Sequence, residues 1–184
     1  MFGGLVGWLL AAAVVLIPTF FVGRYAQTRP SVLSSPRAKS GFGGVMWLFL
    51  AGQIGWLLTL VWQTAYMTSE LWFMLARNSQ TMQAAFVAVV PGLVSIIIGV
   101  WVIWQIAAKR SPNAVAFAVV GVWLMGPCVA MLQSWYFGLA LTELSLIQLF
   151  GWSIGWSLYF ALSPRVALTY GTPRGKRIAE GLEM

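Results

Sequence analysis

Five long apolar runs, none of which contains a lysine, arginine, aspartate or glutamate, dominate this chain of 184 residues. The hydrocarbon core of a bilayer is about 30 Å thick, and a helix needs about 20 residues to cross it. Each run is long enough to do so. The sequence therefore predicts an all-α integral membrane protein, a bundle of five transmembrane helices at Phe2–Val22, Phe42–Tyr66, Ala84–Ala108, Ala114–Gly138 and Leu144–Leu162.

The composition agrees with this prediction. Hydrophobic residues make up 60% of the chain and charged residues only 8%, whereas soluble domains carry about 25% charged residues. So few charges cannot cover the surface of a soluble protein of ordinary make-up. The eleven tryptophans and eleven phenylalanines point the same way, because aromatic side chains gather where a bilayer meets water.

The basic residues predict the orientation of the helices. Successive helices alternate in direction, which places ten of the eleven lysines and arginines on one side and Arg77 alone on the other. Because positively charged loops stay in the cytosol, we expect the N-terminus outside and the C-terminus in the cytosol. No basic residue precedes the first run, as a signal peptide would require, so we interpret that run as a retained helix. A four-span protein that lost it would have the same orientation.

The same basic residues are the predicted contacts with the headgroups of membrane lipids. They are spread over short loops and a tail, which argues against a nucleic-acid partner. The predicted anchors are Arg24, Arg37, Lys39, Lys109, Arg110, Arg165, Arg174, Lys176 and Arg177.

The runs divide the chain into an N-terminal transmembrane helix (1–23), a cytosolic linker (24–41), a four-helix core (42–163) and a basic cytosolic tail (164–184). Prolines in the linker predict irregular structure, and the tail after Tyr170 is expected to be extended or flexible. The outer loop Met67–Gln83 allows two interpretations. It forms either a short helix lying in the membrane interface or an ordinary turn with aromatic anchors.

The residue types that are missing exclude several classes of function. Without histidine or aspartate, the chain has no histidine-ligated metal site and no Ser-His-Asp triad. The lone Cys128 is interpreted as a small hydrophobe. The absence of ionisable residues within the runs argues against ion pumps and proton-coupled transporters. We therefore predict no metal site, no catalytic residue and no cofactor.

Neutral polar residues inside the runs are the candidates for a binding site. Gln53 lies near the middle of the second run, Gln133 lies in the fourth, and Trp56 and Trp123 are also deep in their runs. One interpretation is a pocket for a lipid headgroup or a quinone. The other is hydrogen bonding between helices, worth about 0.6 kcal/mol per bond, with the tryptophans as packing. Gln53 is the first to test, because an unpartnered amide at that depth is costly.

Two pairs of glycines have the spacing that lets membrane helices approach closely. Gly3 with Gly7 and Gly151 with Gly155 form a face either for a partner or second copy, or for packing within the bundle. Prolines inside the runs are predicted to kink three helices; they are Pro18, Pro91 and Pro127.

The end of the fifth run resembles a known family. Trp156–Tyr170 follow the pattern W-x-x-Y-F-x-x-S-x-R-V-x-x-T-[FY], which is similar to the end of the DUF2569 family of small bacterial inner-membrane proteins. Gly41–Leu48 resembles the family's G-x-G-G-W-L opening, and Lys109–Pro112 its basic loop with a proline. The resemblance covers about residues 41–170, although two prolines usual in the family have no match. It implies a four-helix core in a bacterial inner membrane and no assigned activity.

These observations favour a non-catalytic membrane protein. We expect an accessory or scaffold subunit that packs against other membrane-protein subunits of a larger inner-membrane complex. The alternative is a binder or carrier of a lipid, a quinone or another apolar small molecule, with Gln53 and Gln133 as its polar contacts. An enzyme comes third, because it would have to work with Glu70, Glu143 or groups in the membrane interface.

Overall fold

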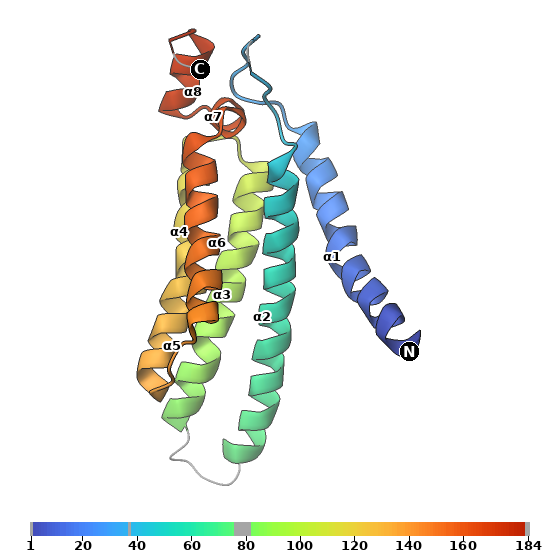
Figure 1. The fold of residues 1–184 in the computed structure, drawn as a ribbon, viewed down its shortest axis with the longest axis vertical. Helices are drawn as coiled ribbons and strands as arrows, with labels where there is room; N and C mark the ends of the chain where they lie inside the picture. The colour runs from blue at the N-terminus through green and yellow to red at the C-terminus, as the bar shows by residue number, and fades with distance from the viewer. Residues whose placement is uncertain (1, 37, 76–81, 183–184) are drawn as a thin grey trace.

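The structure is a computed structural model that describes residues 2–36, 38–75 and 82–182, with side chains for 9–36, 38–71 and 85–182. These residues form helices joined by turns (Figure 1). In chain order, the helices are α1 (Phe2–Thr28), α2 (Val45–Leu75), α3 (Met82–Ala108), α4 (Pro112–Trp123), the π-helical turn η2 (Leu124–Cys128), α5 (Val129–Phe137), α6 (Glu143–Leu162), α7 (Pro164–Tyr170) and α8 (Pro173–Ala179).

Five stretches within the described residues are helical, long enough and apolar enough to cross a bilayer. They are Leu9–Thr28, Val45–Leu71, Ala85–Ala108, Pro112–Phe137 and Glu143–Leu162. Each overlaps one of the predicted runs, so the predicted all-α fold with five such helices is confirmed. Two helices continue well past their predicted ends: α1 continues beyond Val22 to Thr28, and α2 continues beyond Tyr66 to Leu75.

The second of these extensions changes the outer loop. Residues 67–75 continue α2 without a break, so they are neither a separate interfacial helix nor a turn. The physical reason is that no glycine or proline occurs between Trp56 and Leu75 to stop the helix. The rest of that loop, Arg77 included, lies outside the described residues.

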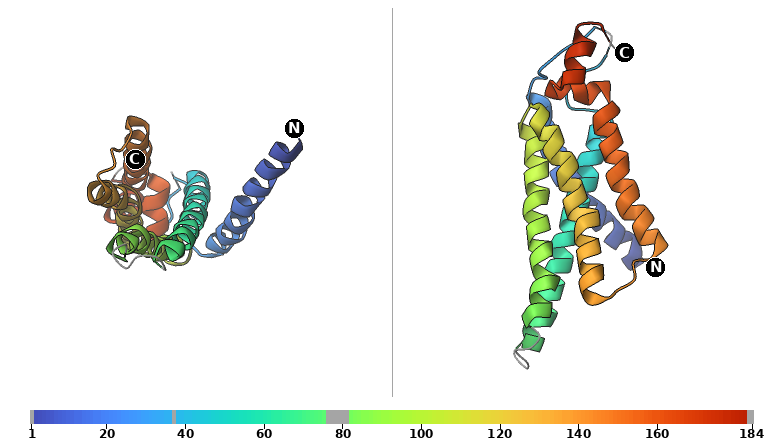
Figure 2. Two further views of the ribbon diagram at one scale, coloured as in Figure 1. Left: turned by 90° about the horizontal axis from the view of Figure 1, so that it is seen from below. Right: turned by 90° about the vertical axis from the view of Figure 1, so that its left-hand side faces the viewer.

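Four of the long helices form a bundle, and α1 leans away from it. The most extensive contact is between α2 and α3, and the contact between α3 and α4 comes next; α6 packs mainly against α4 and η2. The N-terminal end of α1 points away from the other helices in both Figure 1 and the left view of Figure 2. Near its other end α1 approaches α2 so closely that a Cβ atom on Gly23 would collide with the ring of Trp47.

The segment between α4 and α5 is a π-helical turn around Pro127. Proline has no N–H group, so it cannot bond to the carbonyl group four residues earlier. The extra residue in the turn accommodates this missing bond and widens the helix locally. Pro18 and Pro91, in contrast, lie inside α1 and α3, which continue through them.

The prediction of an extended or flexible tail is wrong. Residues after Leu162 form two short helices, and Gly171, in a left-handed conformation with φ of 65°, separates them. Each helix starts with a hydroxyl residue followed by proline. Ser163 Oγ accepts a bond from Val166 N at 3.4 Å, and Thr172 Oγ1 accepts one from Gly175 N at 3.2 Å. Such caps with proline in the first turn are signals for a helix start.

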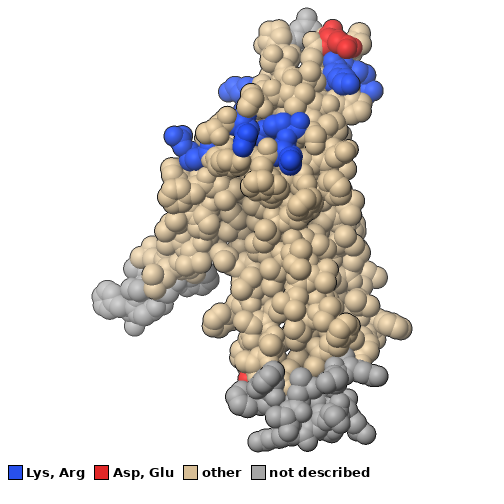
Figure 3. Space-filling model, turned by 180° about the vertical axis from the view of Figure 1, so that it is seen from behind, with Lys and Arg blue, Asp and Glu red and all other residues tan. Residues whose placement is uncertain are grey.

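The core lies toward one end of the bundle, which we call the basic end. It is the end where α1 and α3 finish, α2 and α4 begin, and α7 and α8 cover the helices. The largest fully buried side chains belong to the start of α2, the end of α3 and α7; they include Tyr170, Phe49, Met46, Leu50 and Ile106. On the face shown in Figure 3, the lysines and arginines gather near this same end.

Candidate functional site

An arginine at the basic end holds three helices together. Arg110 Nη1 donates to Ile106 O at 2.8 Å and to the hydroxyl of Tyr170 at 3.3 Å, and Nη2 donates to Ala26 O. The Tyr170 hydroxyl donates to Ile106 O at 2.6 Å. A positive charge at the carboxyl ends of α1 and α3 is also favourable for their dipoles. Arg110 therefore joins the ends of α1 and α3 to α7.

The two groups of this cluster keep their protons at neutral pH. Burial raises the pKa of the Tyr170 phenol well above its ordinary range, although the neighbouring Arg110 opposes the effect. Burial also lowers the pKa of Arg110, and the hydrogen bond to Tyr170 works in the opposite direction. Arginine starts from a value so high that it stays charged at neutral pH. Neither group therefore gains or loses a proton near neutral pH.

The linker between α1 and α2 lies against α7. The backbone N–H groups of Val32 and Leu33 donate to the carbonyls of Thr169 and Leu168 at 3.2 and 3.0 Å. Thr169 Oγ1 accepts a bond from Gly41 N at 2.9 Å. We refer to the described residues of 29–44 together with α7 and α8 as the basic-end cap. The cap explains why Thr169 and Tyr170, at the end of the family-like pattern, are buried.

Two further arginines of the predicted anchor set also contact helix ends. Arg174 Nη1 donates to Ala161 O at 3.1 Å and to Leu162 O, at the carboxyl end of α6. Arg165 Nη1 lies 3.1 Å from the position that a Cβ atom on Gly43 would take, beside the start of α2. The exposed predicted anchors at this end are Arg24, Lys39, Lys109, Lys176 and Arg177, while Arg37 lies outside the described residues.

The four predicted binding residues do not form one site. Gln53 and Trp56 line the same small cavity. Gln133 instead donates to Ala88 O at 3.4 Å, between α5 and α3. Trp123 donates to Ser157 Oγ at 3.0 Å and makes an edge contact with Phe150, between α4 and α6. The last two residues therefore act in contacts between helices, as the packing interpretation expects.

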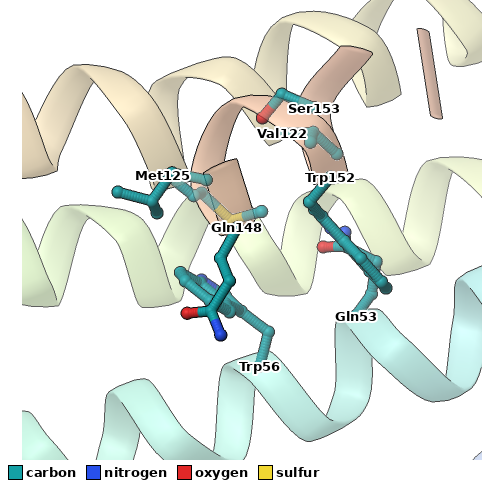
Figure 4. Close-up of a pocket in the computed structure, with 9 residues that line it drawn as sticks. Gln53, Trp56, Val122, Met125, Gln148, Trp152 and Ser153 are labelled. Atoms are coloured by element: carbon teal, nitrogen blue, oxygen red, sulfur yellow. The ribbon is translucent and has the colours of Figure 1, made fainter. Parts of the chain in front are cut away.

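The cavity at Gln53 lies between α2, α4, η2 and α6 (Figure 4). Gln53 and Trp56 come from α2, and the α6 residues of its wall include Gln148 and Trp152. Its volume is about 20 Å³, whereas pockets for drug-sized ligands range from about 300 to 1,000 Å³. A quinone ring or a lipid headgroup does not fit there.

Larger hollows on the surface are grooves with apolar walls. The groove between α3 and α5 has a volume of about 520 Å³, and that between α1 and α3 about 350 Å³. A third groove of about 310 Å³, which we call the α2–α6 groove, has Val45 on one wall and α6 on the other. Its α6 residues are Gly151, Trp152, Gly155, Trp156 and Tyr159.

The glycines of the α2–α6 groove have open space in front of them among the described residues. A Cβ atom added at Gly151 or Gly155 would meet no described atom within 4 Å. At Gly52 and Gly121, in contrast, the added atom would collide with Trp152 and Val102. Gly151 and Gly155 therefore remain an open face on α6. The other pair, Gly3 and Gly7, lies outside the residues whose side chains the structure describes.

The described residues offer no evident catalytic centre. Among them, no group of three histidine, cysteine, aspartate or glutamate side chains could hold a metal ion. Glu70 and Glu143 are exposed, and Cys128 is exposed along the groove between α3 and α5. The sequence alone does not predict the Arg110–Tyr170 cluster, although Arg110 belongs to the basic loop Lys109–Pro112 and Tyr170 ends the family-like pattern.

Comparisons with known proteins add no relative. No family model, no curated protein and no solved structure matches this chain.

Proposed function

We propose that this protein is a non-catalytic membrane subunit that docks a transmembrane helix of a partner protein in its α2–α6 groove. The observation that carries the proposal is the open face of Gly151 and Gly155 inside a groove of about 310 Å³. Small residues spaced in this way let a second helix approach the backbone closely. Three aromatic side chains on α6 give that helix apolar surface to contact; they are Trp152, Trp156 and Tyr159.

The same proposal includes the location and orientation of the protein. It resides in a bacterial inner membrane as a member of the DUF2569 family, with its basic end in the cytosol and its N-terminus outside. The gathering of lysine and arginine at one end of the bundle supports this orientation. A fluorescent protein fused to the C-terminus should fold and fluoresce, since it would be in the cytosol; a dark but exported fusion would contradict the orientation.

The docking proposal is tested by filling the groove. Gly151→Leu and Gly155→Leu each add a side chain into open space, so the fold should remain intact. We expect both variants to keep the thermal stability of the natural protein in mild detergent and to lose the partner protein that co-purifies with it. Ile97→Trp is the matched control, because it adds bulk at an exposed site of α3 outside the described grooves.

Two outcomes would contradict this function. Retention of the partner by both leucine variants would exclude the groove as the docking site. Co-purification of tagged with untagged copies, and of no other protein, would show that a second copy occupies the groove instead.

A second candidate function is the binding of an apolar small molecule in the groove between α3 and α5. Its volume of about 520 Å³ is the observation in favour, because it falls in the range of ligand pockets. Native mass spectrometry should then find a stoichiometric ligand that is lost in Leu132→Trp, which fills this groove, and retained in Gln53→Leu. Loss of the ligand in Gln53→Leu alone would show that it binds at Gln53 and not in the groove between α3 and α5.

A further inference from the structure

Three buried side-chain oxygen atoms have no hydrogen-bond partner among the described residues. One of them, Ser95 Oγ, lies on α3, and the other two share a small cavity near the middle of the bundle. These two are Gln53 Oε1 on α2 and Ser153 Oγ on α6, and both line the small cavity beside η2 (Figure 4). Their side chains are 2% and 1% exposed. Buried polar groups nearly always find a partner, in the protein or in an ordered water. These two atoms therefore require a third group.

Ser153 differs from Ser157 and Thr19, two hydroxyl residues that also lie inside long helices. Ser157 Oγ donates to Ser153 O at 2.7 Å, and Thr19 Oγ1 donates to Val15 O at 2.7 Å. Each thus bonds to the carbonyl one helical turn earlier, which is the usual solution inside a helix. Ser153 Oγ does not do so and instead stays in the cavity wall, near Gly126.

The cavity has room for one small molecule. Its volume is about 20 Å³, and a single water needs about 10–15 Å³. The open space extends to Gly126 of η2, where an added Cβ atom would lie 3.7 Å from Ser153 Oγ and 3.9 Å from Leu149 Cδ2. The lining residues include no carboxylate, so a bare cation would have no opposite charge there.

We propose that one ordered water occupies this cavity and donates hydrogen bonds to Gln53 Oε1 and Ser153 Oγ. Buried waters typically make two to four such bonds, and this one would satisfy both of these oxygens at once. The water would join α2 to α6, which otherwise meet through large aromatic side chains such as Phe49 and Trp156. This inference is independent of the proposed docking function.

Hydroxyl-radical labelling of the natural protein in detergent tests the proposal, because radicals formed from an internal water oxidise the side chains around it. Met125 lines the cavity, whereas Met46 lies in the apolar core; they are 4% and 1% exposed. We expect mass spectrometry to show Met125 oxidised several-fold faster than Met46. Equal rates would mean a dry cavity and would overturn the proposal.

Gly126→Ala provides the matched variant, because its methyl group occupies the cavity at ordinary contact distances. We expect this change to lower the oxidation rate of Met125 to that of Met46. Gly155→Ala, which adds the same methyl group outside the cavity, should leave both rates unchanged. An unchanged rate for Met125 in a folded Gly126→Ala protein would also overturn the proposal.

Discussion

Two short helices at opposite ends of the bundle, α7 and α5, differ in how much of their surface is buried. In α7 every residue from Val166 to Tyr170 is buried, whereas α5, two residues longer, has no buried residue at all. The basic end has a packed core, and its helix ends are bonded to Tyr170 and Arg174 of the cap. The other end presents its apolar side chains outward.

The contrast separates folding from recognition. Substitutions at the basic end should cost stability, because the side chains there pack and form hydrogen bonds within the chain. Substitutions of exposed residues at the other end, and of Gly151 and Gly155 in the α2–α6 groove, should leave stability unchanged and affect only what binds there. The following predictions test this division, beginning with the largest expected effect.

Tyr170→Ala should be the most damaging of these changes. The side chain is fully buried and donates to Ile106 O, and removing a large aromatic group from a core costs about 3–5 kcal/mol. Leu132→Ala on α5 should change the unfolding free energy by less than about 0.5 kcal/mol. Thermal unfolding in mild detergent measures both. Similar losses for the two variants would show that both ends contribute equally.

Arg110→Met should have the next largest effect. It removes the bonds to Ala26 O and Ile106 O at the ends of α1 and α3, and a hydrogen bond to a charged group is worth about 1.5–3 kcal/mol. The matched control is Lys109→Met, because Lys109 is the exposed neighbour. Denaturant unfolding should show a clear loss for the first and little change for the second. An equal loss of stability in Arg110→Met and Lys109→Met would show that the positive charge of this loop, and not the hydrogen bonds of Arg110, stabilises the fold.

Gly23→Ala should cost about 1–3 kcal/mol, because overpacking forces neighbouring groups to move. Its new methyl group would collide with the rigid ring of Trp47 and push α1 away from α2. Gly155→Ala should change stability by less than about 0.5 kcal/mol. The melting temperatures of both variants measure these effects. Gly23 lies at a closed contact between helices and Gly155 on an open face, so an equal loss of stability would mean that the α2–α6 groove is packed.

The smallest effect concerns alkaline pH. Burial raises the pKa of Tyr170 above its ordinary value of about 10. The unfolded chain then loses this proton first, so the contribution of Tyr170 is fully present below pH about 10 and is lost as the pH rises further. The slope is at most about 1.4 kcal/mol per pH unit. The melting temperature should fall between pH 9 and about 11. Tyr170→Phe should reduce this fall. The same fall in both proteins would exclude Tyr170 as its source.

The sequence was sufficient for the helices but not for their contacts. The apolar runs predicted five long helices because a bilayer requires length and hydrophobicity, and both can be counted. The caps Ser163-Pro164 and Thr172-Pro173 are equally clear signals for the starts of α7 and α8. The glycines and the proline after Tyr170 suggested an extended or flexible tail instead, although proline in the first turn of a helix favours the helix.

The contacts that make up the sites depend on tertiary structure. Arg110 bonds to Ala26, 84 residues earlier in the chain, and no local pattern specifies such a pair. Gln53 was a candidate because of its depth, but its partners in the cavity, Ser153 and Gly126, come from two other elements. The sequence also could not predict that Gly151 and Gly155 form an open face, because the GxxxG spacing is the same whether another helix covers the glycines or not.

One side chain belongs to two of the places described above. Trp152 lines both the cavity of Gln53 and the α2–α6 groove, and its ring rests on Gly52. The indole is thus a thin partition, with the polar interior on one side and the outer apolar surface on the other. A helix that pressed on this ring from outside would tighten the seal around the interior, and a change of its rotamer would connect the two compartments.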